Sequence, residues 1–169
     1  MYLLTAIITS LLLIPMASCV RKDSSEVMGL KEEVAKLKQT VEGIKPGLGE
    51  IMGVIQQHHE KLYFSGLNEN WPLAQYEFDE IKENLDRVTD LYEHFEDLKV
   101  SLIELRHLTD TPMQEIKKAM EEKNKAKFMA EFNALTQSCN QCHQAAEHAF
   151  IRIQIPHTSS FSNQKFSIN

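Results

Sequence analysis

The chain has 169 residues, of which 43% are hydrophobic and 25% are charged, a composition typical of a globular protein rather than a disordered one. Its formal net charge is -6. No basic patch or stripe is visible that would neutralise phosphates, so the sequence argues against nucleic-acid binding. The three cysteines, Cys19, Cys139 and Cys142, do not form a disulfide framework, so each needs a separate explanation.

The N-terminus has the pattern of an export signal. Residues 3–16 form an apolar run that is shorter than the ~20 residues of a membrane span but matches a signal-peptide core. The run leads through small residues to Cys19 and resembles the lipobox of bacterial lipoprotein signals, although it lacks a preceding Lys or Arg. The resemblance implies a signal peptide at residues 1–18 and a lipid on Cys19 that anchors the protein to a membrane in the periplasm. An uncleaved anchor and ordinary signal cleavage are the alternatives.

A heptad repeat follows within residues 19–46. Its a positions are valines and its d positions are Leu or Ile: Val27, Leu30, Val34, Leu37, Val41 and Ile44. This choice of residues favours a parallel two-stranded coiled coil. Glu26 and Glu33 at g would face Lys31 and Lys38 at e of the partner. The pattern therefore predicts a stalk that forms a homodimer through Val27–Ile44. Three heptads are marginal alone, so an amphipathic helix packed on its own domain is the alternative.

Residues 47–150 show helical spacing without a period-two strand pattern, which predicts an all-α domain. A break at Pro46 and Gly47 separates this domain from the stalk. We expect one helix from Leu48 to a terminating Gly66, a second beginning at Asn70, and a third with a fresh start at Asp110 after an apolar stretch at residues 98–108. The second helix carries an apolar stripe from Phe78 to Phe95, and a last helix carries Phe128 to Ala146. Short connections predict a four-helix bundle with antiparallel neighbours, followed by an extended tail at residues 151–169 that lies along it.

The sequence Cys139-Asn140-Gln141-Cys142-His143 has the form C-x-x-C-H, which indicates covalent attachment of a c-type haem. On a helix, thiols three residues apart lie on one face and reach the two vinyl groups of one porphyrin. The adjacent imidazole then reaches the iron. We therefore expect one haem c, with thioethers at Cys139 and Cys142 and with His143 as the proximal iron ligand. A redox-active dithiol, a zinc site and a structural disulfide are the alternatives.

This motif on the last of four helices resembles the cytochrome c-prime family and its six-coordinate relatives over residues 48–150. In that family a residue early in the first helix covers the haem face opposite the histidine, and in six-coordinate members it is a methionine that binds iron. The resemblance implies Met52 as the distal iron ligand. His59, seven residues later on the same face, is the competing distal ligand or a partner of the haem propionates. Family members often carry an arginine four residues after the haem histidine, where this chain has Glu147.

Other polar and aromatic residues have ordinary structural interpretations. We expect His58 to be a surface residue. A solvated acidic face is expected at Glu77, Asp79, Glu80 and Glu83. Core packing, with haem contact as the alternative, is expected for Tyr63, Phe64, Trp71, Phe128 and Phe132.

Together these patterns predict a periplasmic monohaem electron carrier and not an enzyme. One alternative is a five-coordinate protein that binds nitric oxide or carbon monoxide. Another is a structural coiled-coil lipoprotein subunit of a larger redox complex. The sequence does not name the redox partner.

Overall fold

The computed structural model describes residues 20–92 and 100–168, with side chains from residue 24 onward. The predicted signal peptide, Cys19, and the expected helical positions Phe95 and Leu98 lie outside this part of the chain. All regular structure in the described residues is helical, which confirms the all-α expectation. No helix within them is long and apolar enough to span a membrane. The chain divides into two compact units between Lys45 and Pro46.

The first unit contains helix α1, Val20–Ile44. Its a and d side chains, from Val27 to Ile44, are between 42% and 76% exposed. The apolar stripe is therefore exposed on α1 itself, and both the coiled-coil stalk and packing on the chain's own domain stay predictions.

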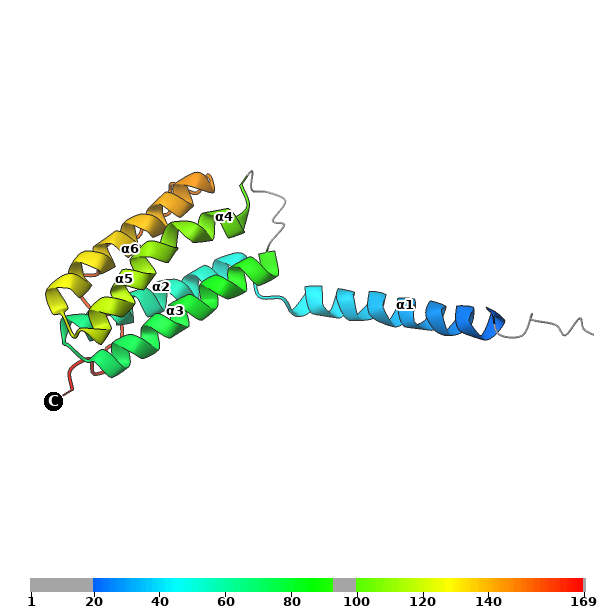
Figure 1. Ribbon diagram of the computed structural model, residues 1–169, viewed down its shortest axis with the longest axis horizontal. Helices are drawn as coiled ribbons and strands as arrows, with labels where there is room; N and C mark the ends of the chain where they lie inside the picture. Colours follow the sequence, from blue (N-terminus) through cyan, green and yellow to red (C-terminus); the bar gives the residue numbers. More distant parts are fainter. Residues whose placement is uncertain (1–19, 93–99, 169) are drawn as a thin grey trace, which may run out of the picture. The chain divides into compact units, whose positions relative to one another are not determined.

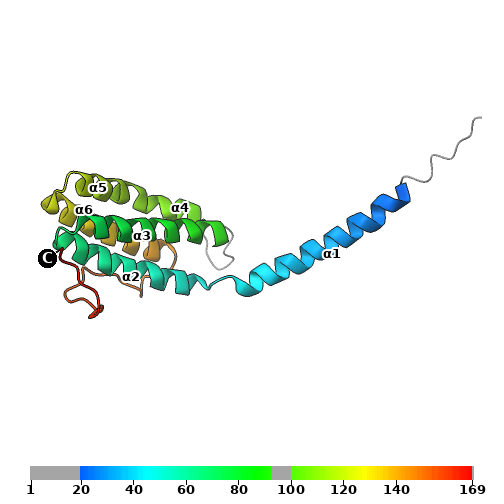
Figure 2. The same ribbon diagram turned by 90° about the horizontal axis from the view of Figure 1, so that it is seen from below.

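The second unit contains the remaining helices, which are α2 (Leu48–Leu67), α3 (Trp71–Tyr92), α4 (Leu102–Arg106), the 3-10 turn η1 (His107–Thr109), α5 (Asp110–Glu121) and α6 (Lys125–Ala145). Figures 1 and 2 show α2, α3, the combined α4–α5 arm and α6 side by side, each reversing the direction of the one before. Helix α2 packs on α3 and α6, and α5 packs on α6. The core between them is closed by side chains that are at most 2% exposed, among them Leu62, Ile81, Ile116, Phe128, Phe132 and Leu135.

Three helices end in the same left-handed turn, and none of these turns uses glycine. Glu69, Lys123 and Glu147 have φ values of 56°, 51° and 61°. After α6, the N–H of His148 donates to the carbonyl of His143 at 2.7 Å, and the N–H of Glu147 donates to that of Gln144 at 3.1 Å. This pair of bonds is a Schellman motif, in which glycine is the usual left-handed residue.

Helix α2 ends at Leu67, next to Gly66 as expected, but Gly66 is not the left-handed residue of the turn that ends it. Gly66 lies within the last turn of α2, and no glycine among the described residues has a positive φ. It is buried, and a Cβ at this position would overlap the ring of Phe128 on α6. Gly66 therefore permits the close approach of α2 and α6.

Helix α5 begins at Asp110, as expected, but no break in the helical backbone precedes it. The backbone stays helical from α4 through η1 into α5, and Thr109 has φ -93° and ψ -11°. Pro112 cannot donate to the carbonyl of residue 108, and its ring crowds that carbonyl. The proline thus accounts for the 3-10 turn η1, and the helical backbone continues through this turn into α5.

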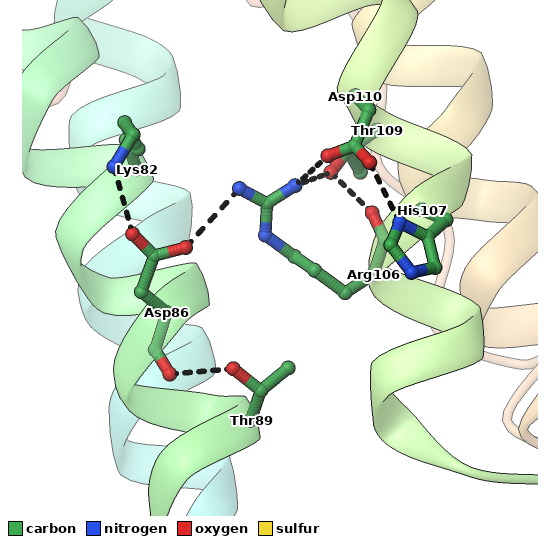
Figure 3. Close-up of polar contacts among 7 residues, drawn as sticks. All are labelled: Lys82, Asp86, Thr89, Arg106, His107, Thr109 and Asp110. Carbon is green, nitrogen blue, oxygen red and sulfur yellow. Dashed lines mark hydrogen bonds and ion pairs between the residues drawn. The ribbon is translucent and has the colours of Figure 1, made fainter.

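Arg106 fastens this turn to α3, as Figure 3 shows. Its guanidinium donates to Asp86 at 3.2 Å, to Asp110 at 2.6 Å and to Thr109 at 2.8 Å. Burial alone would raise the pKa of Asp86, but hydrogen bonds and charge from Lys82 and Arg106 outweigh it and lower that pKa. The carboxylate is therefore ionised, and it holds the α4–α5 arm against α3.

A second polar contact joins α2 to α3 and corrects two surface assignments. Glu77 is 1% exposed rather than part of a solvated face. Nδ1 of His58 lies 2.6 Å from its Oε2, so His58 is a half-buried partner of this carboxylate and not a surface residue. Periodicity placed both residues on the polar side of their helices, where the neighbouring helix covers them.

Candidate functional site

The C-x-x-C-H residues lie near the end of α6, where Cys139 and Cys142 are one turn apart. Both are half-buried against the core, and both thiols are free. Together with His143 they line one cavity of about 420 Å³. That volume is within the usual range for sites that hold small molecules and cofactors.

The walls of this cavity are mainly aliphatic and come from every arm of the second unit. They include Ile55 from α2, Ile81 and Leu85 from α3, Leu102 from α4 and Leu135 from α6. The cavity also takes Met52 and His59 from α2. The structure thus brings together all the predicted site residues of the described chain, while Cys19 lies outside it.

The two thiols are in an environment that favours their protonated form. Burial raises the pKa of Cys139 to about 12 and raises that of Cys142 as well. A redox-active dithiol needs a thiolate stabilised by a lowered pKa, and a zinc site also uses thiolates. The cavity therefore argues against both of these alternatives. Within the described residues, no three His, Cys, Asp or Glu side chains group as a metal site.

His143 is held in one orientation by the chain that follows α6. Its Nδ1 lies 3.1 Å from the carbonyl oxygen of Ile151. A carbonyl can only accept, so Nδ1 carries the proton and, in the neutral ring, Nε2 carries a lone pair. Histidines that bind metals through one nitrogen commonly donate the other N–H to a carbonyl or carboxylate in this way.

His59 is held in the opposite tautomer, deeper in the same cavity. Its Nε2 lies 2.9 Å from Oγ1 of Thr136, whose hydroxyl donates to the carbonyl of Phe132 at 2.9 Å. The hydroxyl hydrogen is therefore already used, and Nε2–H of His59 must be the donor. Burial lowers the pKa of His59 to about 4, so the ring is neutral at pH 7.

The contact between His59 and Thr136 also fixes the register of α2 against α6. The two helices run in opposite directions (Figure 1). Seven residues before His59 is Met52, and seven residues after Thr136 is His143. Each step covers about 10 Å along a helix axis, so Met52 is level with His143. The register favours Met52 over His59 as the residue opposite the histidine of the motif.

The aromatic residues do not line the cavity. Phe128 and Phe132 are fully buried, and their rings stack with centroids 6.1 Å apart. Trp71 packs edge-on against Phe128 at 5.9 Å. Core packing is therefore the correct interpretation of these side chains. Neither Glu147 nor Arg152 contributes to the cavity wall.

Sequence reasoning missed several residues of the site. Thr136 was not singled out, although it lies one turn before Cys139 on the same helix. Ile151 and Ile153 belong to the predicted tail and were not expected at the cavity, which they line. Asn140 was treated as a variable position within the motif. A comparison with protein-family models, curated proteins and solved structures finds no match to this chain.

Proposed function

We propose that this chain is an exported monohaem c-type cytochrome that carries electrons. Cys139 and Cys142 would hold haem c through thioethers, with His143 as the proximal iron ligand and Met52 as the distal one. The bundle would then be a cytochrome c-prime-like fold. When bound, the haem supplies one-electron redox chemistry at its iron.

The observation that carries the proposal is the hydrogen bond of His143. Its Nδ1–H donates to the Ile151 carbonyl, which leaves Nε2 as the ring nitrogen that would bind the iron. Two neutral thiols lie beside His143 in an apolar cavity. This donor set fits a covalently attached porphyrin, whose edges need apolar walls and whose iron needs an imidazole nitrogen.

The chain's own residues would each have a defined part in this function. The aliphatic walls exclude water from the porphyrin faces, and exclusion of water is one means by which a protein sets a haem potential. A methionine sulfur that binds the iron on the side opposite a histidine, as proposed for Met52, would raise the haem potential further. His59 is already bonded to Thr136 and would support the cavity rather than bind the iron.

The proposal also includes a tether. The lipobox pattern supports a lipid anchor at Cys19 in the periplasm, and the exposed stripe of α1 supports a parallel coiled-coil dimer. Attachment to a membrane would raise the local concentration of the stalks and so favour their pairing.

Substitution of Met52 tests the electron-carrier form of the proposal. We expect the wild-type protein to show a low-spin haem spectrum and Met52→Ala to show a high-spin one, because the sixth ligand is lost. His59→Ala should stay low-spin, which makes it the matched control from the same helix and cavity. A high-spin wild-type protein that binds carbon monoxide rapidly would instead support the five-coordinate alternative. A spectrum unchanged in Met52→Ala would remove Met52 from the iron.

A further inference from the structure

The chain after α6 turns back and pairs with the haem-attachment motif itself. The side-chain amide of Asn140 makes two hydrogen bonds to the backbone of Ile153. It accepts from the N–H at 2.7 Å and donates to the carbonyl at 2.9 Å. Both bonding groups of one backbone residue are thus satisfied by a single side chain within the motif.

The second contact lies two residues earlier on the same extended segment. There the carbonyl of Ile151 accepts the Nδ1–H of His143 at 3.1 Å. Asn140 and His143 are three residues apart on α6, and Ile153 and Ile151 are two apart on the segment. The segment therefore runs beside the end of α6, with Ile153 at Asn140 and Ile151 at His143. The Asn140 bonds therefore place the Ile151 carbonyl beside His143.

The far end of this segment is fastened to α2. The N–H of Ser160 donates to the carboxylate of Glu60, and Nζ of Lys61 lies 4.5 Å from the centroid of the Phe161 ring. Phe166 is 9% exposed, and its ring centroid lies 5.5 Å from that of Phe64. We call residues 151–166 the C-terminal strap. One end of the strap is hydrogen-bonded to α6, and the other end contacts α2.

We propose that the C-terminal strap positions the proximal histidine, His143. Asn140 fixes the register of the strap against the C-x-x-C-H motif through its hydrogen bonds to Ile153. This inference rests on the proposed function, because it assigns His143 to the iron. Asn140 is not among the residues that line the cavity. It acts through the strap by presenting the Ile151 carbonyl, which selects the tautomer with a lone pair on Nε2.

The test compares Asn140→Ala with Gln141→Ala in the whole chain. Gln141 is the other variable position of the motif, and it is exposed, so its loss controls for altering the motif. Asn140→Asp keeps the acceptor for the Ile153 N–H but loses the donor. Amide exchange of Ile153 reports the strap, and ¹⁵N chemical shifts of the His143 ring report its tautomer. Both are measured in the haem-free chain and, with the midpoint potential, in the haem-containing chain.

We expect Asn140→Ala to speed Ile153 exchange roughly tenfold or more, because two hydrogen bonds are lost. The His143 ring should then become a mixture of tautomers, and the midpoint potential should shift. Gln141→Ala should match the wild type, and Asn140→Asp should fall between. Unchanged Ile153 exchange in Asn140→Ala would overturn the inference. Faster exchange with an unchanged His143 ring would overturn it too, because the strap would not position the histidine. A wild-type chain without haem would refute the proposed function, whereas the two haem-free readouts would still decide whether the strap positions His143.

Discussion

His59 and His143 line the same cavity, and their hydrogen bonds give them opposite tautomers. His143 donates from Nδ1 to a backbone carbonyl, and His59 donates from Nε2 to a hydroxyl. The first arrangement frees the nitrogen that is farther from the backbone, as an iron ligand requires. The C-x-x-C-H motif is recognisable from five consecutive residues of the sequence. The tautomers could not, because His59 meets Thr136 across 77 residues of sequence and that meeting exists only in the folded chain.

The buried His59 makes the stability of the haem-free chain depend on pH. Its pKa is lowered by burial to about 4 from an ordinary value of 6.5. Above pH 6.5 the ring is neutral in both the folded and the unfolded state, so its protonation does not reduce the free energy of unfolding. As the pH falls from 6.5 to 4, only the unfolded state takes up the proton, and the free energy of unfolding decreases by about 3 kcal/mol in total.

Urea denaturation at several pH values measures this loss. His59→Gln should flatten the dependence between pH 6.5 and 4, whereas the same change at the exposed His157 should leave it as in the wild type. If the free energy of unfolding depends on pH equally in His59→Gln and the wild type, the pH dependence does not come from His59.

At the scale of the element, the bodies of the helices and the starts of α2, α3 and α5 were predictable, but the turns that end the helices were not. Apolar stripes of helical spacing place α2, α3 and α6 because burying those stripes is what stabilises the bundle. The ends depend on backbone turns at Glu69, Lys123 and Glu147, whose residue types carry no left-handed preference. Gly66 looked like a terminator because glycine usually marks one, but its role is set by Phe128, which lies far away in sequence.

In the haem-free chain, two of the three glycines of α2 give opposite predictions for the same substitution. Gly66→Ala should destabilise the fold by about 1–3 kcal/mol, because the added methyl group overlaps the Phe128 ring and overpacking costs roughly that much. Gly53→Ala meets nothing within 4 Å and should stabilise the helix by about 0.5–1 kcal/mol. Thermal unfolding of the two variants checks both signs, and a harmless Gly66→Ala would refute the close approach of α2 and α6.

At the scale of the whole molecule, the cavity is built from residues of every arm of the bundle together with the tail. This explains why the sequence predicted candidate ligands in the cavity but not most of the residues that form its walls. The proposed coiled-coil stalk belongs to the same scale, because its six apolar a and d positions are exposed on α1. A second copy would supply the matching pattern of Glu26 and Glu33 against Lys31 and Lys38.

The stalk prediction is checked by sedimentation of the exported chain in detergent. The wild type should be a dimer. Leu37→Glu, at a d position, should shift it to a monomer, because a charge is placed in the seam. Gln39→Glu lies on the outer face of the same heptad and should leave the dimer intact. A monomeric wild type, or a Leu37→Glu variant that stays dimeric, would exclude the pairing of Val27–Ile44.

The most direct test of the account is the mass and pigment of the chain after export through a host that matures c-type cytochromes. We expect the intact mass to rise by that of one haem and the haem to stay on the peptide that contains Cys139 and Cys142 after denaturation. Cys139→Ala with Cys142→Ala should abolish this attachment. A folded wild-type chain that is colourless, with both thiols open to alkylation, would contradict the account.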